Sequence, residues 1–158
     1  MLRRVGLIAV VFALVLPATA AARVYPVNWH EAFRYQNRVF VAFTVRSVAI
    51  GGGTWTVTGS VTNAAPTPLT LTRRHFGLRL YRTRYATPRT PNVFLPARRM
   101  APAFPLALPP GQTWTGTFSG GGPIPHGRWI RVNFGSFAKI APTLPPTWSW
   151  ITDHTFRY

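Results

Sequence analysis

Acidic residues are almost absent from this sequence. It has 158 residues, with 18 lysines and arginines against only Glu31 and Asp153, so its formal net charge is +16. Because these two residues are the only acidic side chains, catalysis by a pair of carboxylates is nearly excluded. Lys139 is the only lysine, so arginine carries the charge, and its guanidinium suits bidentate contacts with phosphate and carboxylate. Codon bias toward arginine is the alternative explanation.

Cysteine is absent altogether. Its absence excludes disulfides, thiolate metal sites and a cysteine nucleophile. The protein must therefore be held together by a hydrophobic core, and a composition of 47% hydrophobic and 14% aromatic residues makes such a core feasible. The chain length is typical of one domain.

Residues 1–22 are predicted to be a secretory signal peptide. The segment starts with two arginines, continues with an apolar run of 12 residues, and offers small residues for cleavage near Ala20 or Ala22. The apolar run is shorter than the roughly 20 residues of a membrane span, and an uncleaved anchor is the alternative. Residues 23–158 are then the single predicted domain, with a net charge of +14. We therefore expect a secreted, extracytoplasmic protein.

The clearest secondary-structure signal is an alternating run in the first half of the chain. Trp55, Val57, Gly59 and Val61 share one face of this run, and threonine and serine occupy the other. Another alternating run precedes it, and the glycine-rich loop between them predicts a β-hairpin. We expect the apolar face to lie in the core, with Gly59 at a bulge or at a close backbone approach.

About seven short strands are expected in all, separated by glycine and proline turns. Trp29 lies in a segment for which we expect at most one helical turn. Residues 82–111 contain seven prolines, which exclude a central strand or a helix, so we expect a long Pro/Arg-rich crossover loop there. This pattern is typical of an all-β protein, either a two-sheet sandwich or a barrel.

Several pieces of the sequence resemble the immunoglobulin-like domains of small secreted or lipid-anchored bacterial proteins. They are Gly59-x-Val61-x-Asn63, Leu69-x-Leu71, Phe76-x-Leu78-x-Leu80, Leu108-Pro109-Pro110-Gly111-Gln112 and Ile130-x-Val132-x-Phe134. The resemblance implies an immunoglobulin-like two-sheet sandwich used for adhesion, scaffolding or ligand contact in the cell envelope, and it does not imply catalysis. The chain departs from those domains because it lacks a lipid-anchor cysteine and nearly all acids.

The densest basic part of the sequence predicts an anion-binding surface. Its candidate contacts are Arg73, Arg74, Arg82, Arg84, Arg98 and Arg99. Aromatic residues lie among these arginines, and this combination suits phosphate contacts and ring stacking. The expected partner is an anionic envelope polymer or a membrane surface, with nucleic acid as a less favoured polyanion. A solvated basic face without a ligand is the alternative.

Trp129 is the candidate for a protein contact. It lies on the strand face opposite Ile130 and Val132, and tryptophan is enriched at binding hot spots. The rival hypothesis is therefore a structural or protein-interaction module that uses exposed aromatics, with the charge incidental.

No catalytic residue, metal ligand or cofactor site is predicted. The four histidines lie far apart and lack the spacing of a zinc site. Asp153 and His154 are adjacent, so in a strand their side chains would point to opposite faces. We therefore expect a non-enzymatic protein. A compact pocket that holds His154 or His30 beside Glu31 would instead favour an enzyme.

Overall fold

The computed structural model describes residues 21–87, 89–138 and 147–158, without the side chains at 71–75 and 136–150. Nearly all of the predicted signal peptide, residues 1–20, lies outside the described residues. The described part contains ten strands. They are β1 (Arg23–Tyr35), β2 (Arg38–Gly51), β3 (Thr54–Asn63), β4 (Leu71–Tyr81), β5 (Asn92–Pro96), β6 (Arg99–Ala101), β7 (Thr113–Gly121), β8 (Trp129–Ala138), β9 (Thr147–Ile151) and β10 (Phe156–Arg157).

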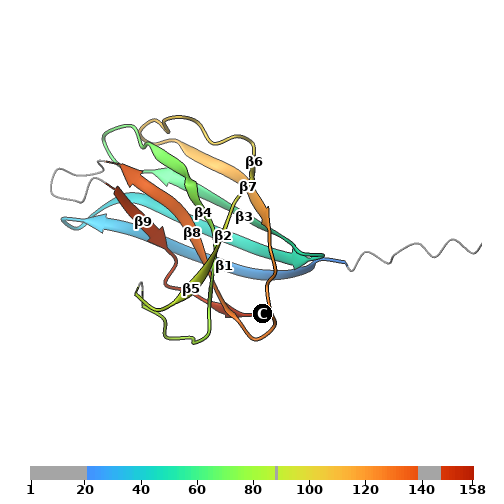
Figure 1. The fold of residues 1–158 in the computed structure, drawn as a ribbon. Helices are drawn as coiled ribbons and strands as arrows, with labels where there is room; N and C mark the ends of the chain where they lie inside the picture. The colour runs from blue at the N-terminus through green and yellow to red at the C-terminus, as the bar shows by residue number, and fades with distance from the viewer. Residues whose placement is uncertain (1–20, 88, 139–146) are drawn as a thin grey trace, which may run out of the picture.

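The strands form two antiparallel sheets that pack face to face (Figure 1). The first sheet has the order β1-β2-β3-β7-β6 and the second has the order β10-β8-β4-β5, with β9 and β10 pairing with successive parts of β8. Apart from β1 and β5, this order matches the ABED and CFG sheets of an immunoglobulin sandwich. The predicted all-β, immunoglobulin-like sandwich is confirmed, with ten strands rather than about seven.

Strand β1 is the main secondary-structure error of the sequence-based prediction. Where at most one helical turn was expected, the chain forms a 13-residue edge strand paired with β2. The pairing shifts register between Pro26 and Trp29 and again between Phe33 and Arg34. Each shift breaks the alternation of apolar and polar residues, so the sequence pattern of period two is lost.

The proline-rich segment 82–111 crosses from the second sheet to the first. It contains the short strands β5 and β6, and each lies at the edge of a different sheet (Figure 1). Edge strands tolerate proline because one side of the strand has no ladder hydrogen bonds to lose. The side chains of Phe104 and Leu108 are buried and fix the rest of the segment to the core. The described part of the predicted crossover therefore packs on the core and is not wholly a loop.

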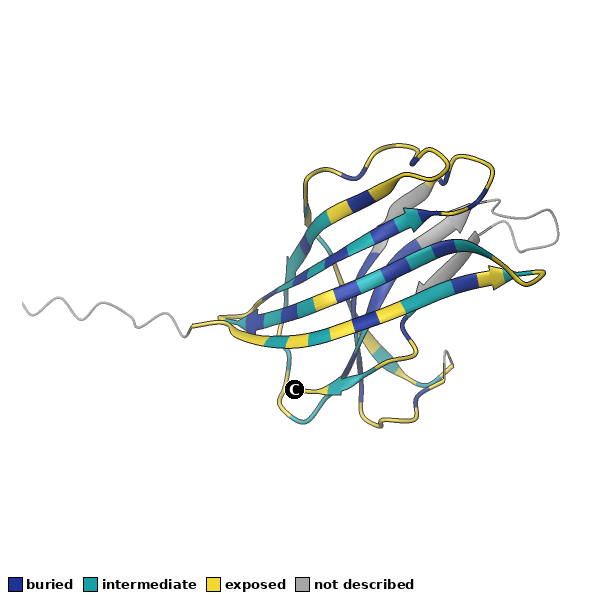
Figure 2. Cartoon of the chain, turned by 180° about the vertical axis from the view of Figure 1, so that it is seen from behind, coloured by how far each residue is buried: buried dark blue, intermediate teal, exposed yellow. Residues whose placement is uncertain are grey.

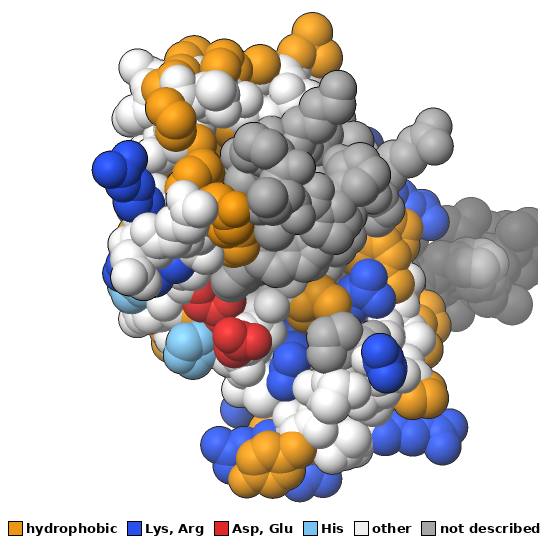
Figure 3. Space-filling model, turned by 90° about the vertical axis from the view of Figure 1, so that its left-hand side faces the viewer, with side chains coloured by type: hydrophobic (Ala, Val, Ile, Leu, Met, Phe, Trp, Pro, Cys, Tyr) orange, Lys and Arg blue, Asp and Glu red, His pale blue; other side chains and the backbone are white. Residues whose placement is uncertain are grey.

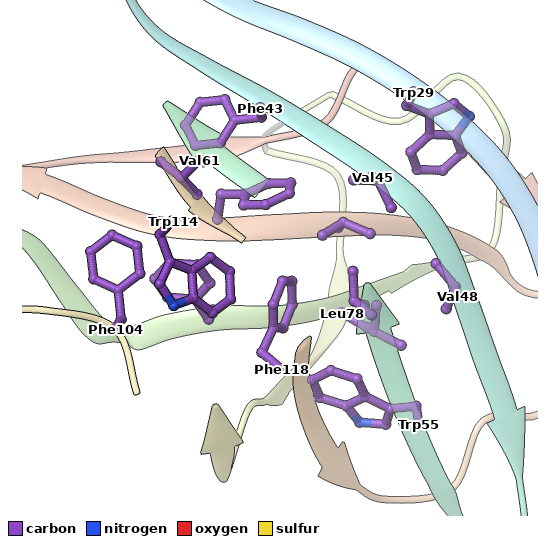
Figure 4. Close-up of a cluster of buried hydrophobic side chains, with 14 of the residues drawn as sticks. Trp29, Phe43, Val45, Val48, Trp55, Val61, Leu78, Phe104, Trp114 and Phe118 are labelled. Carbon is purple, nitrogen blue, oxygen red and sulfur yellow. The ribbon is translucent and has the colours of Figure 1, made fainter. Parts of the chain in front are cut away.

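Both sheets contribute side chains to one aromatic-rich core. Burial alternates along β3 as predicted, with Trp55, Val57 and Val61 almost fully buried (Figure 2). At the centre, the ring of Phe118 lies 5.3 Å from the ring of Phe76, measured between centroids, and 6.3 Å from that of Trp55. Figure 4 shows Phe118 and Trp55 among the other buried side chains of this core.

Gly59 lies where β2 and β3 approach each other closely. A Cβ atom at this position would lie only 2.3 Å from the carbonyl oxygen of Thr44. Beside it, the pairing of β2 with β3 shifts register between Val45 and Ser47. The predicted bulge and close backbone approach are thus both confirmed.

We expect Gly59→Ala to lower the free energy of unfolding by about 1–3 kcal/mol, because the backbone of β2 must move to accept the added methyl group. Urea-induced unfolding measures this change. Gly121→Ala is the matched control, since a Cβ there would lie at an ordinary 3.5 Å from the nearest atom, the carbonyl oxygen of Gly53. Equal stability of the two variants would contradict the steric explanation.

Candidate anion-binding site

The structure separates the arginines that the sequence groups together. Arg82 and Arg84 follow the end of β4, whereas Arg98 and Arg99 lie beyond the opposite end of β5. All four are exposed. Arg73 and Arg74 belong to β4, but their side chains are outside the described set.

Two cavities accompany these separated arginines. Arg82 lines an open cavity of about 470 Å³ together with Arg128, Leu80 and Val93. Arg98 and Arg99 line a different cavity, of about 310 Å³, beside the first sheet. The predicted anion-binding residues therefore lie on at least two separate surfaces and do not form one cluster.

A second group of charged and aromatic residues lies on the outer side of the second sheet. Along β4 and β8, leucine, isoleucine and valine side chains fill the core, so the residues between them face outward. We use the name "arginine face" for the outward-facing residues Arg79 and Tyr81 of β4, Phe94 of β5, and Trp129 and Arg131 of β8.

Strand pairing places two arginines of this face directly opposite each other. Arg79 of β4 pairs with Arg131 of β8, and Tyr81 pairs with Trp129 in the next outward-facing row. Like charges at directly opposite positions destabilise an antiparallel pair. Neither arginine makes an ion pair within the part of the chain that the structure describes. The two arginines therefore extend from directly opposite backbone positions, without an acidic partner among the described residues.

Aromatic rings and one amide position the two guanidinium groups. The Cζ atom of Arg79 lies 5.0 Å from the centre of the Phe94 ring, and that of Arg131 lies 5.5 Å from the centre of the Tyr81 ring. The Nη1 atom of Arg79 also donates a hydrogen bond of 3.0 Å to Oδ1 of Asn92. Cation–π contacts of this kind contribute about 0.5–1 kcal/mol at exposed sites, so they hold both side chains over the sheet.

Three polar atoms of the arginine face are buried and have no hydrogen-bond partner among the residues that the structure describes. They are Nε of Arg79, Nε of Arg131 and the hydroxyl oxygen of Tyr81. Burial raises the pKa of Tyr81, and the charges of Arg79 and Arg131 oppose part of that rise. The hydroxyl is therefore protonated at neutral pH and can donate, as both Nε–H groups can. An oxygen-rich anion matches the two cations of this face.

Arg84 extends the arginine face at the end of β4. Its Cζ atom lies 5.7 Å from the centre of the Trp129 ring and 5.7 Å from the centre of the Tyr85 ring. Trp129 is half-buried and lies on the strand face opposite Ile130, as predicted, whereas Tyr85 is 84% exposed. Figure 3 shows arginine and apolar side chains interleaved at the lower end of the molecule.

Glu31 is paired with a histidine far from it in sequence. Its Oε1 atom lies 2.9 Å from Nδ1 of His154 and accepts a second hydrogen bond from the backbone N–H of that residue, at 3.2 Å. The ring of Trp29 stacks on His154 with 5.7 Å between centroids. This is the residue pair associated above with an enzyme, but neither member lines the two cavities described above. The pair instead connects the β9–β10 turn to β1.

Neither a metal cluster in the described residues nor a known relative indicates a function for the chain. No group of three or more His, Asp or Glu residues that could hold a metal ion occurs within the described ranges. The same residues include no helix long and apolar enough to cross a membrane. No protein-family model, curated protein or solved structure matches the chain.

Proposed function

We propose that this protein is a non-enzymatic, secreted domain that binds anionic polymers or lipid headgroups of the cell envelope through its arginine face. The observation that carries the proposal is the pair Arg79 and Arg131, directly opposite each other and without an acidic partner in the described part of the chain. A ligand anion would relieve their repulsion, because no acidic side chain in the described residues pairs with either arginine.

The composition of the face supports phosphate or carboxylate as the group recognised. Guanidinium groups make strong, often bidentate hydrogen bonds with either anion. The half-buried ring of Trp129 offers a surface for stacking a sugar or a headgroup. The net charge of +14 without the predicted leader would attract a polyanion over a longer range, to a degree that depends on salt.

Sedimentation with lipid vesicles and competition by polyphosphate test this proposal. We expect the protein to sediment with phosphatidylglycerol vesicles but not with phosphatidylcholine vesicles. We also expect retention to fall at least about tenfold between roughly 50 and 500 mM NaCl, because salt screens exposed charges. Binding to polyphosphate but not to vesicles would identify a polymer ligand. Equal retention on both vesicles, or retention unaffected by salt, would contradict electrostatic recognition.

Protein contact is the second candidate function, and the exposure of Tyr85 favours it. Tyr85 is 84% exposed beside Arg84, which also contacts the half-buried Trp129. Tyrosine, tryptophan and arginine are the residues most enriched at binding hot spots. An interaction with an envelope protein that is insensitive to salt and is lost in Tyr85→Ala would favour this function over anion binding.

A further inference from the structure

The cavity of about 470 Å³ lies on the inner side of the second sheet, at the end where the first sheet no longer covers it. Val93 of β5 pairs with Leu80 of β4, so both side chains point to the core side of the sheet. Two residues further along β5, Leu95 is only 8% exposed, whereas Val93 is 53% exposed. Figure 1 shows β5 and the start of β8 extending below the strands of the first sheet. The floor of the cavity is therefore apolar, inward-facing and open to solvent.

Two arginines from neighbouring strands border this floor. The last pair of the β4–β8 ladder joins Tyr81 to Trp129. One residue further on, the same register places Arg82 opposite Arg128, and both line the cavity. The backbone N–H of Tyr158 donates to the carbonyl oxygen of Arg128 at 2.9 Å, which fixes the chain at the start of β8. The two arginines are the only charged residues that line the cavity, and neither has an ion pair within the described residues.

The polar side chains in the wall of the cavity already make hydrogen bonds within the protein. The side-chain amide of Asn92 accepts a bond from Nη1 of Arg79 and donates one to the carbonyl oxygen of Thr90, each at 3.0 Å. The hydroxyl oxygen of Thr90 accepts a bond from the backbone N–H of Thr87 at 2.8 Å. These bonds hold the wall in place. A ligand would therefore find an apolar floor and two guanidinium groups at its border.

We propose that this cavity binds an anionic amphiphile with a single alkyl chain. The chain lies on the floor beside Val93 and Leu80, and it removes the exposed valine side chain from water. The carboxylate or phosphate head makes charge-assisted hydrogen bonds with Arg82 and Arg128. A simple anion would leave the apolar floor in water, and a neutral amphiphile would leave both arginines without a partner. The volume lies in the range of about 300–1,000 Å³ that is usual for small-molecule sites. The arginine face lies on the opposite side of the same sheet, so the two sites are separate.

Titration of the full chain with octanoate, butyrate and octanol, followed by NMR, tests the proposal. We expect octanoate to bind at least about tenfold more tightly than butyrate, because each buried CH₂ group should tighten binding about two- to fourfold. We also expect it to bind at least about tenfold more tightly than octanol, which has no charge. Octanoate should shift the methyl resonances of Val93, assigned by their loss in Val93→Ala.

Two variants separate the contributions of the border and of the floor. Arg82→Gln/Arg128→Gln should lose the preference for octanoate over octanol, whereas the charge-matched variant Arg38→Gln/Arg46→Gln should keep it. Those control arginines are exposed residues of β2, in the other sheet. Val93→Thr changes an exposed side chain and should weaken the binding of octanoate and octanol by similar factors, because it makes the floor more polar.

Several outcomes would overturn this assignment. Equal affinities for octanoate and butyrate would exclude an apolar site, and equal affinities for octanoate and octanol would exclude a role of the two arginines. If both double-arginine variants lost the preference equally, binding would follow net charge alone. Unshifted methyl resonances of Val93, with or without binding elsewhere, would exclude the cavity. Failure of the vesicle experiment leaves these measurements unaffected, because they depend on residues of the other side of the sheet.

Discussion

Replacing Arg79 and Arg131 together by glutamine is expected to lower the affinity for polyphosphate about a hundredfold at low salt. Each guanidinium should contribute one charge-assisted contact of about 1.5–3 kcal/mol, and about 1.4 kcal/mol corresponds to a factor of ten. The polar side chain of glutamine can follow a similar path over the rings of Phe94 and Tyr81. The sheet should therefore remain folded. Isothermal titration calorimetry measures the change.

A charge-matched control separates the arginine face from a general effect of net charge. Arg38 and Arg46 are exposed residues of β2, in the other sheet. The double variant Arg38→Gln/Arg46→Gln removes the same two charges and should lower the affinity less than about threefold, since these charges act only at a distance. If both double variants lose affinity equally, binding follows net charge and the arginine face is not a site.

Asn63→Ala is expected to lower the free energy of unfolding by about 3–5 kcal/mol, because buried hydrogen-bonding groups are left unsatisfied at about 1–3 kcal/mol each. Asn63 is fully buried at the end of β3. Its Nδ2 atom donates to the carbonyl oxygens of Thr67 and Leu108, at 2.9 and 2.8 Å, and its Oδ1 atom accepts from the N–H of Ala65 at 2.9 Å. Urea-induced unfolding measures the loss.

The size of this effect follows from the place of Asn63 in the fold. Its side chain joins the end of β3 to the following turn and to the end of the crossover segment, and its backbone also bonds to Gly111 and Gln112. The control is Thr62→Ala on the neighbouring residue, whose hydroxyl makes one exposed hydrogen bond, to Thr113. That variant should lose less than about 1 kcal/mol. Similar losses in the two variants would contradict the bracing role of Asn63.

The strands with unbroken alternation could be predicted from the sequence. The run from Trp55 to Val61 has its apolar face in the core, and Trp129 lies on the outer face of β8, both as predicted. Strand β1 could not be recognised because two register shifts interrupt its alternation. Proline density excluded central strands from 82–111, but it did not reveal that the segment supplies an edge strand to each sheet.

The candidate site was harder to predict, because it depends on strand pairing. Closeness in sequence suggested one group that includes Arg82 and Arg98, and β5 carries these residues to different surfaces. Arg79 and Arg131 are distant in sequence, and only the pairing of β4 with β8 places them opposite each other. The alternation around each residue did indicate an outward-facing position. It contained no information about which strand would be the neighbour.

NMR spectra of the arginine Nε–H groups, recorded during a titration with polyphosphate, test the central claim most directly. The Nε atoms of Arg79 and Arg131 are buried and have no hydrogen-bond partner in the described part of the chain, so their N–H signals should be protected from exchange with water. We predict that polyphosphate shifts these two resonances first and furthest, while those of Arg38 and Arg46 stay nearly unchanged. If polyphosphate binds and the signals of Arg38 and Arg46 move as much as those of Arg79 and Arg131, the arginine face is not the binding site.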